Sequence, residues 1–172
     1  MRSMPGKVHS EREDQTGWII FDHPERRNAL SDNMWGELAE ACVELDADPD
    51  VRVVVLRGAG EKAFISGADI SQFARESGDE TAAKLGRGGG DAFSALASFE
   101  KPLLAMIHGH CIGGGVLIAL AADIRYASED SVYAIPAAKL GIGYDVSGVE
   151  ALAAVVGLAS AKEILFSAAR YS

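Results

Sequence analysis

The sequence has 172 residues, a formal net charge of −9, and apolar residues at 48% of its positions. This length suggests one domain, and the apolar content is sufficient for a hydrophobic core. Because binding along a phosphate backbone needs a basic surface, the acidic balance argues against nucleic acid or an anionic membrane as the main partner. It leaves room for a small anionic ligand held by a few arginine, lysine or amide groups.

Two features bear on the cellular compartment. The opening residues, MRSMPGKVHSERED, lack the apolar centre of a signal peptide, and the apolar run over 103–122 is broken by histidines and glycines, which argues against a membrane span. Cys42 and Cys111 lie in apolar surroundings and are interpreted as buried free thiols, which suits a reducing compartment. We therefore expect a cytoplasmic protein.

Strand and helix patterns alternate along the first half of the chain. A strand is expected over residues 18–21, followed by a loop. From Ser31, the apolar residues at 35, 38, 42 and 45 have helical spacing, with Ser31 or Asp32 as the N-cap and Pro49 beyond the end. The segment VRVVVLRGAG predicts a buried strand, residues 63–65 predict a second one, and SGADISQFARES changes from loop to helix.

The second half continues the alternation. The run GRGGG at 86–90 fits either a flexible loop or a helix break, and helical spacing resumes over 91–99. KPLLAMIHG predicts a strand, and a helix follows the next glycines through Ala121. Two strands are then expected at IRYAS and VYAIP, and two helices at VSGVEALAAVVG and SAKEILFSAAR. This interleaving favours an α/β architecture.

The glycine triplet Gly113–Gly115 needs an explanation, because glycine costs roughly 1 kcal/mol against alanine inside a helix. A glycine turn before a helix exposes free N–H groups, and the peptide dipoles there favour an anion or a polarised carbonyl oxygen. The segment FISGADI, residues 64–70, offers a second such turn, and two converging amides form an oxyanion hole. The alternative is that both are ordinary tight turns that pack a helix against a sheet.

Four segments of the sequence resemble the enoyl-CoA hydratase/isomerase (crotonase) family: HPERRNALS, RVVVLRGAGEKAFISGADI, KPLLAMIHGHCIGGG and AADIRYASEDSVYAIPAAKLGIG. Their order and separation match that family, and the resemblance covers nearly the whole chain. It implies one acyl-CoA-binding core over residues 1–172, folded as a crotonase-like spiral of strand–strand–helix repeats, in a homotrimer or dimer of trimers. Family chains continue into C-terminal helices that close the acyl pocket and help to trimerise, so we expect that segment to be missing after FSAARYS.

The resemblance also implies a site for acyl-CoA thioesters, with coenzyme A as part of the substrate and no separate cofactor. The thioester oxygen would lie between the backbone amides of Ala68 and Gly114. Contacts to adenine and pantetheine would lie near Arg26, Ala29, Ser66, Ala68 and Ile70. Ser71 stands where many members carry a lysine near the adenine or phosphate.

The residues that would select the reaction depart from the hydratase pattern. Leu117 and Ala137 stand where family hydratases carry two glutamates, and neither can move a proton, so efficient hydration is not expected. Asp145 matches the aspartate that shuttles a proton in dienoyl-CoA isomerases and attacks the ring in 4-chlorobenzoyl-CoA dehalogenases, although Ala137 replaces the aromatic residue of the latter. Asp145 could instead cap the next helix, but Ser147 and Glu150 offer that helix its own capping box.

Two hypotheses follow from these residues. The first is an enoyl-CoA hydratase/isomerase-type enzyme in which Ala68 and Gly114 stabilise an enolate and Asp145 is the acid/base. The second is a catalytically silent CoA-binding homologue or scaffold. His108 and His110 have no third ligand at a suitable spacing, so no metal site is expected.

Overall fold

The computed structural model describes residues 5–69, 89–144 and 146–172. Within these residues a five-stranded sheet has the order β1-β2-β3-β5-β7 and a four-stranded sheet has the order β4-β6-β8-β9. The first sheet is formed by Lys7–Glu13, Thr16–Asp22, Val53–Gly58, Leu103–Ile107 and Ile124–Ala127, named in sheet order. The second is formed by Ala63–Ile65, His110–Ile112, Val132–Ala134 and Arg170–Tyr171. Only β1–β2 and β8–β9 pair antiparallel among the described strands, so the centre of each sheet is parallel.

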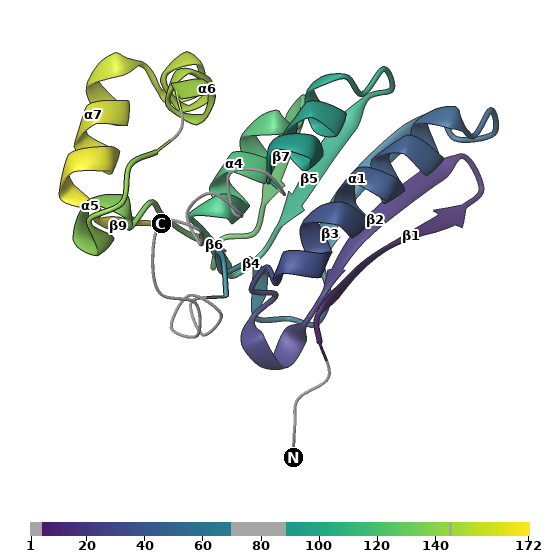
Figure 1. The fold of residues 1–172 in the computed structure, drawn as a ribbon, viewed down its shortest axis with the longest axis horizontal. Helices are drawn as coiled ribbons and strands as arrows, with labels where there is room; N and C mark the ends of the chain where they lie inside the picture. Colours follow the sequence, from purple (N-terminus) through teal and green to yellow (C-terminus); the bar gives the residue numbers. More distant parts are fainter. Residues whose placement is uncertain (1–4, 70–88, 145) are drawn as a thin grey trace.

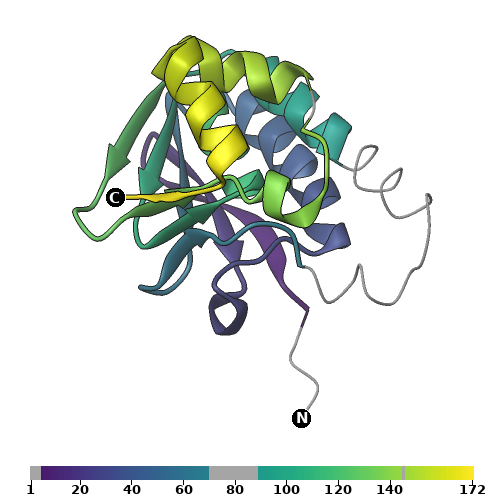
Figure 2. The ribbon, with the colours of Figure 1, turned by 90° about the vertical axis from the view of Figure 1, so that its left-hand side faces the viewer.

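The helices among the described residues are η1 (Pro24–Arg26), α1 (Asp32–Ala47), α4 (Gly114–Ala121), α5 (Ala137–Leu140), α6 (Val146–Val156) and α7 (Leu158–Ser167), and residues 89–97 are also helical. Of these, α1, α4 and the helical residues 89–97 lie on one side of the larger sheet, as Figures 1 and 2 show. Helix α6 packs against α4, and α7 packs against α6. The C-terminal helices therefore extend the helical layer beyond α4, on the side away from α1.

Helix α1 confirms the helical spacing and the N-cap that the sequence predicts from Ser31 onward. Ser31 is its N-cap, and Trp35, Leu38, Cys42 and Leu45 are all buried. These side chains join a core in which Phe21 of β2 meets Phe64 of β4 edge-on, with ring centroids 5.9 Å apart. The core thus connects the two sheets at the point where the glycine turns begin.

Most of the expected strands and helices are present, with several differences. The strand β1 and the short elements β6, β9 and α5 were not expected from the sequence. β1 is an edge strand with a mostly exposed face, so its polar sequence hides the alternation of a half-buried strand. β6 has three residues between glycines, too few to give a periodic signal.

The capping prediction for α6 was wrong. The helix begins at Val146, so Ser147 lies inside its first turn and is not the N-cap. The predicted helix after Asp69 lies outside the described residues. Of the GRGGG run, residues 86–88 also lie outside them, whereas Gly89 and Gly90 are helical. Cys42 and Cys111 are buried free thiols, as predicted.

The described residues also bear on a membrane span and on a metal site. None of their helices has both the length and the apolar character that spanning a membrane requires. They also contain no group of three or more His, Cys, Asp or Glu side chains placed to hold a metal ion.

Candidate functional site

The three consecutive glycines at the start of α4, Gly113 to Gly115, have three different environments. Gly113 has φ +55° and ψ −114°, a backbone conformation that strongly favours glycine, and its N–H donates to the Ala134 carbonyl at 2.8 Å. A Cβ on Gly115 would lie 2.5 Å from the Ile65 carbonyl oxygen, so this glycine lets α4 approach β4. A Cβ on Gly114 would meet Trp35 Cη2 at 3.4 Å, an ordinary contact. Backbone conformation and close packing therefore explain two of the three.

The second turn, residues 66–69, is held by the loop 23–30. Leu30 N–H donates to the Gly67 carbonyl, and Asp69 N–H donates to the Leu30 carbonyl, both at 2.8 Å. These two bonds form a parallel bridge between Leu30 and Ala68. Because successive backbone groups of an extended chain point to opposite sides, the N–H of Ala68 itself points away from Leu30.

Asn28 anchors that loop and was not singled out from the sequence. Its side chain is fully buried, accepts a hydrogen bond from His23 N–H at 2.9 Å, and donates to the carbonyls of Ala59 and Ala63 at 3.0 and 2.8 Å. Its φ of +56° belongs to the left-handed region, which asparagine tolerates better than most residues. An asparagine directly after two arginines in a loop is the signal that could have identified it.

The two glycine turns touch each other. A Cβ on Gly67 would lie 3.3 Å from the Ile112 carbonyl oxygen, and one on Gly113 would lie 3.9 Å from the Gly67 Cα. Across the described ranges, the backbone nitrogens of Ala68 and Gly114 donate no hydrogen bond. The fold thus brings the turns that carry both predicted donors into contact and leaves the two N–H groups available.

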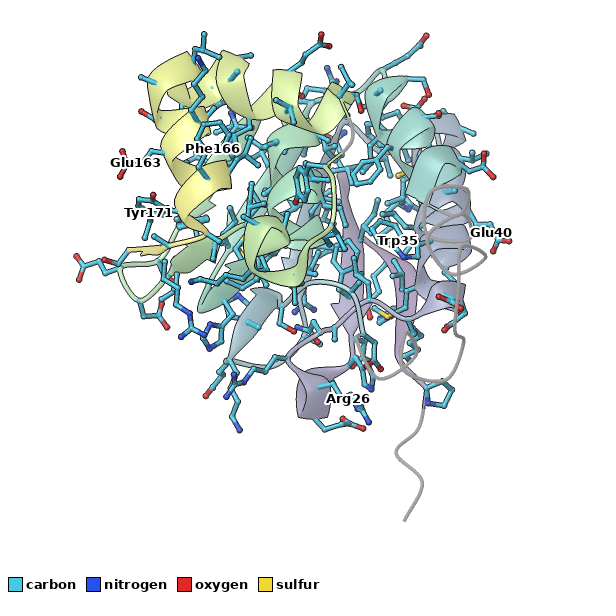
Figure 3. The ribbon with its side chains drawn as sticks, turned by 60° about the vertical axis from the view of Figure 1, so that its left-hand side comes forward. Arg26, Trp35, Glu40, Glu163, Phe166 and Tyr171 are labelled. Atoms are coloured by element: carbon cyan, nitrogen blue, oxygen red, sulfur yellow. The ribbon has the colours of Figure 1, made fainter. Side chains whose placement is uncertain are left out.

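The residues predicted to contact CoA lie where the loop 23–30 meets the turn 66–69. Nη1 of Arg26 donates to both carboxylate oxygens of Asp69, at 3.1 and 3.3 Å, and the Asp69 side chain is only 10% exposed. Ser66 Oγ donates to the Arg26 carbonyl at 3.2 Å, and Ala29 is buried directly after Asn28. Figure 3 shows Arg26 beside η1, at the edge of the molecule. Ile70 lies outside the described residues.

The two positions of the absent glutamates lie in apolar surroundings. Ala137 is buried at the start of α5. Leu117 lines a pocket of about 640 Å³, which we call the α4–α6 groove, formed by Gly89, Gly90, Phe93, Ser94, Ala97, Leu117, Ala121, Ser147, Gly148 and Ala151. None of these lining side chains is titratable. Asp145, the remaining candidate acid/base, lies outside the described residues.

The buried donors without a hydrogen-bond partner in the described structure include Trp35 Nε1, whose ring faces Gly114, and the Tyr144 hydroxyl, whose ring lies beside Gly148 of α6. The indole carbons Cζ2 and Cη2 of Trp35 face Gly114, and Nε1 lies on the same side of the ring system as Cζ2. Burial raises the pKa of Tyr144 well above its usual range, so its hydroxyl remains a neutral donor. Unpaired buried donors are rare in folded proteins and need an acceptor to account for them.

The remaining titratable groups near the turns do not suggest a nucleophile. Burial raises the pKa of Cys111 to about 12, so its thiol stays protonated at neutral pH. Burial, with the charges of Arg27 and Arg170, lowers the pKa of His110, which is neutral at pH 7. Among the described residues, the chemistry available at the turns is therefore hydrogen bonding from backbone and side-chain donors.

Comparison with known proteins gives consistent results. Residues 11–172 match the sequence model for enoyl-CoA hydratase/isomerase. The short-chain-enoyl-CoA hydratase of Clostridium acetobutylicum is 35% identical over 158 residues, covering 92% of this chain and 60% of the relative. The peroxisomal Delta(3,5)-Delta(2,4)-dienoyl-CoA isomerase of Arabidopsis thaliana is 37% identical over 165 residues, covering 90% and 59%.

Solved structures show the same relationship. An enoyl-CoA hydratase/isomerase family protein from Hyphomonas neptunium superposes with a TM-score of 0.91 at 36% identity, over 95% of this chain and 63% of that one. The present chain spans about three fifths of the length of the curated relatives it matches. The match confirms the predicted crotonase-like α/β fold. This chain belongs to the enoyl-CoA hydratase/isomerase family.

Proposed function

We propose that this chain forms the core of an acyl-CoA enzyme in which the amides of Ala68 and Gly114 bind the thioester oxygen. The contact between the two glycine turns is the observation that carries the proposal, because it joins two N–H groups that the described residues do not use. Two such donors stabilise the enolate that forms when a proton leaves the carbon next to the thioester. The unpaired Trp35 donor, whose ring faces Gly114, further supports a ligand with acceptor atoms here.

The proposed reaction is isomerisation of an enoyl- or dienoyl-CoA rather than hydration. Leu117 and Ala137 cannot activate water, which leaves Asp145 as the acid/base that removes and returns the substrate proton. The relatives include both enoyl-CoA hydratases and dienoyl-CoA isomerases, so the choice rests on these residues and not on the relatives' names. Position 145 directly precedes α6, whose first turn supplies Ser147 and Gly148 to the α4–α6 groove.

The second candidate function is a catalytically silent CoA-binding or scaffolding protein. Its support is the apolar character of both glutamate positions: Ala137 is buried, and Leu117 lies in a groove whose described lining residues include no titratable group. Both candidates share coenzyme A as part of the ligand and no separate cofactor. We also propose a homotrimer or dimer of trimers and a cytoplasmic location; exposed apolar side chains on the C-terminal helices, such as Phe166, support self-association.

One pair of variants tests the oxyanion hole. Gly114→Pro removes the N–H at the first position of α4, where a helix tolerates proline. We expect kcat/KM for 3-enoyl- or 3,5-dienoyl-CoA to fall by about 10²–10³, with the circular dichroism spectrum retained. Gly114→Ala keeps the N–H and should lose far less. Equal losses in the two variants would contradict the proposed donor.

Asp145→Asn separates the two candidate functions. Turnover of crotonyl-CoA, 3-enoyl-CoA and 3,5-dienoyl-CoA is measured together with CoA binding by calorimetry. The enzyme predicts isomerase turnover that disappears in the variant while CoA still binds. A wild-type protein that binds CoA and converts none of the three thioesters would instead support the silent homologue.

A further inference from the structure

Trp35 on α1 carries a buried polar atom that the described residues leave without a partner. The residue is only 6% exposed, and no acceptor among the described residues binds its Nε1. The indole N–H is a donor in every state and never an acceptor, so neither rotation nor a change of tautomer satisfies it. Because nearly all buried polar groups in folded proteins are paired, this one indicates an acceptor from outside the described residues.

The other buried side-chain atoms that lack a partner among the described residues have more ways to find one. They are one ring nitrogen on each of His9, His23 and His108, and the Tyr144 hydroxyl. A neutral imidazole nitrogen is a donor or an acceptor according to the tautomer, and a hydroxyl can rotate and serve as either. Trp35 combines a donor-only group with a position against a glycine turn of the proposed site.

Contacts of the indole ring show where this donor lies. A Cβ on Gly114 would be 3.4 Å from Cη2 and 3.8 Å from Cζ2, and Nε1 lies farther from that position than Cη2 does. The ring also packs against Phe93, with the two ring centroids 5.7 Å apart. Figure 3 shows the Trp35 side chain inside the molecule. The ring is therefore held between the start of α4 and Phe93.

This placement separates the indole N–H from the proposed oxyanion hole. Its benzene carbons, and not its N–H, approach the glycine whose amide would bind the thioester oxygen. Phe93 lines the α4–α6 groove together with Leu117, which stands where hydratases carry a glutamate that acts on the reacting carbons. The acceptor for Trp35 is therefore expected on the acyl side of the ligand, beyond the thioester.

A hydrocarbon acyl chain would leave this donor buried and unpaired. A phenylalanine at position 35 would provide an aromatic wall without that cost, so the nitrogen is the feature that calls for an explanation. Sites that hold a buried donor reject ligands without the matching acceptor far more strongly than apolar sites distinguish similar hydrocarbons. The indole is neutral, so a hydroxyl, ether or keto oxygen suits it better than a carboxylate does.

We propose that the acyl group of the substrate carries an uncharged oxygen beyond C3, and that the N–H of Trp35 donates a hydrogen bond to it; this inference rests on the proposed function. Trp35 is then a residue that determines specificity. It selects oxygen-bearing acyl groups over hydrocarbon chains of the same shape, while the glycine turns hold the thioester common to both.

Calorimetry with matched pairs of thioesters tests the proposal without requiring turnover. In each pair a hydroxyl replaces a methyl group: 4-hydroxybutyryl-CoA against pentanoyl-CoA, 5-hydroxypentanoyl-CoA against hexanoyl-CoA, and 3-hydroxybutyryl-CoA against 3-methylbutyryl-CoA. We expect the hydroxylated member of the first or second pair to bind about tenfold more tightly than its methyl counterpart.

The other outcomes of this series contradict distinct claims. No preference in the first two pairs, while CoA still binds, would overturn the role of Trp35. A preference confined to the 3-hydroxybutyryl pair would place the acceptor at C3 and refute the proposed position. No binding of CoA or of any thioester would overturn the proposed function itself.

Two substitutions locate the effect. Trp35→Phe keeps an aromatic ring and removes the N–H, so it should abolish the hydroxyl preference and leave the affinity for CoA unchanged. Trp18→Phe changes the other tryptophan, which lies on β2 with the Arg57 guanidinium 5.7 Å from its ring centroid, and should keep the preference. A preference that persists in Trp35→Phe would refute the proposal.

Fluorescence keeps the proposal testable if Trp35→Phe does not fold. In Trp18→Phe, Trp35 is the only tryptophan left, so the emission reports on it alone. A new hydrogen bond from the indole N–H shifts tryptophan emission to longer wavelength. We expect that shift with the preferred hydroxyacyl-CoA and not with its methyl counterpart. Identical spectra for the two bound thioesters would refute the hydrogen bond.

Discussion

Two regions of this molecule differ in how well their polar groups are hydrogen-bonded and their apolar side chains are buried. The loop 23–30 and the turn 66–69 form a polar junction in which a buried asparagine, an ion pair and several backbone bonds match donors to acceptors. The helices α5–α7 instead expose large apolar side chains, and Phe166 is 77% exposed. Most donors and acceptors of the first region are therefore paired, although the buried His23 Nε2 has no partner there, whereas the second region gains less from burial. Local stability should therefore differ between them.

The largest expected effect is at Asn28. Asn28→Ala leaves the Ala59 and Ala63 carbonyls and the His23 N–H without their buried partner, so we expect a loss of about 3–5 kcal/mol in the free energy of unfolding. Urea unfolding measures it. Asn28→Gly accepts the left-handed φ without strain, so it isolates the hydrogen bonds from the backbone conformation. A loss below about 1 kcal/mol in both variants would mean that the polar junction is not a source of stability.

The glycines at the start of α4, next to the polar junction, give a second test. A methyl group on Gly115 meets the Ile65 backbone at 2.5 Å, so Gly115→Ala should cost about 2–3 kcal/mol. Gly114→Ala makes only an ordinary contact and should change stability by less than about 1 kcal/mol. Thermal unfolding of the two variants side by side checks the difference. The reverse order would show that α4 does not rest on β4 as described.

The buried thiols predict how stability depends on pH. Burial raises the pKa of both Cys42 and Cys111 from 9.0 to about 12, so the folded state holds protons that the unfolded state releases. Their contribution is complete below pH 9 and is lost as pH rises from 9 toward 12. Each thiol should lower the free energy of unfolding by about 1.4 kcal/mol per pH unit in this window. Cys111→Ala should remove one such contribution from the slope measured by urea unfolding between pH 9 and 10.5.

The smallest effect is expected on α7. Phe166→Ser should change the stability of the isolated chain by no more than about 0.5 kcal/mol, because its side chain is mostly exposed. Hydrogen exchange should be faster in α7 than in α1, whose apolar face is buried. Equal protection of α1 and α7 from hydrogen exchange would mean that the poorer burial of α7 does not lower its local stability.

Much of the fold could be predicted because its signals are local. Trp35, Leu38, Cys42 and Leu45 repeat at helical spacing, and all four are buried in α1. The strand over 63–65 was predicted with its observed bounds. β1 escaped detection because only Val8 along that edge strand is buried, which leaves no alternation to read.

The candidate site was predictable only in part. The glycine turns signalled available N–H groups, but spacing alone could not show that Gly67 lies against Ile112 and Gly113. Asn28 was missed because its partners, Ala59 and Ala63, lie more than 30 residues away along the chain. The groove depends on three helices meeting, an arrangement that no local pattern encodes. Asp145 and Ile70 remain predictions from sequence position.

The hydrogen bonds that position the two turns also affect how the chain folds during its synthesis. Leu30 must meet Gly67, and Gly113 must meet the Ala134 carbonyl, before both N–H groups are in position. A nascent chain leaving the ribosome therefore carries an incomplete pair of turns until Ala134 has emerged. Such distant pairings slow folding, so translation speed over this stretch would influence how much newly made protein acquires its native arrangement.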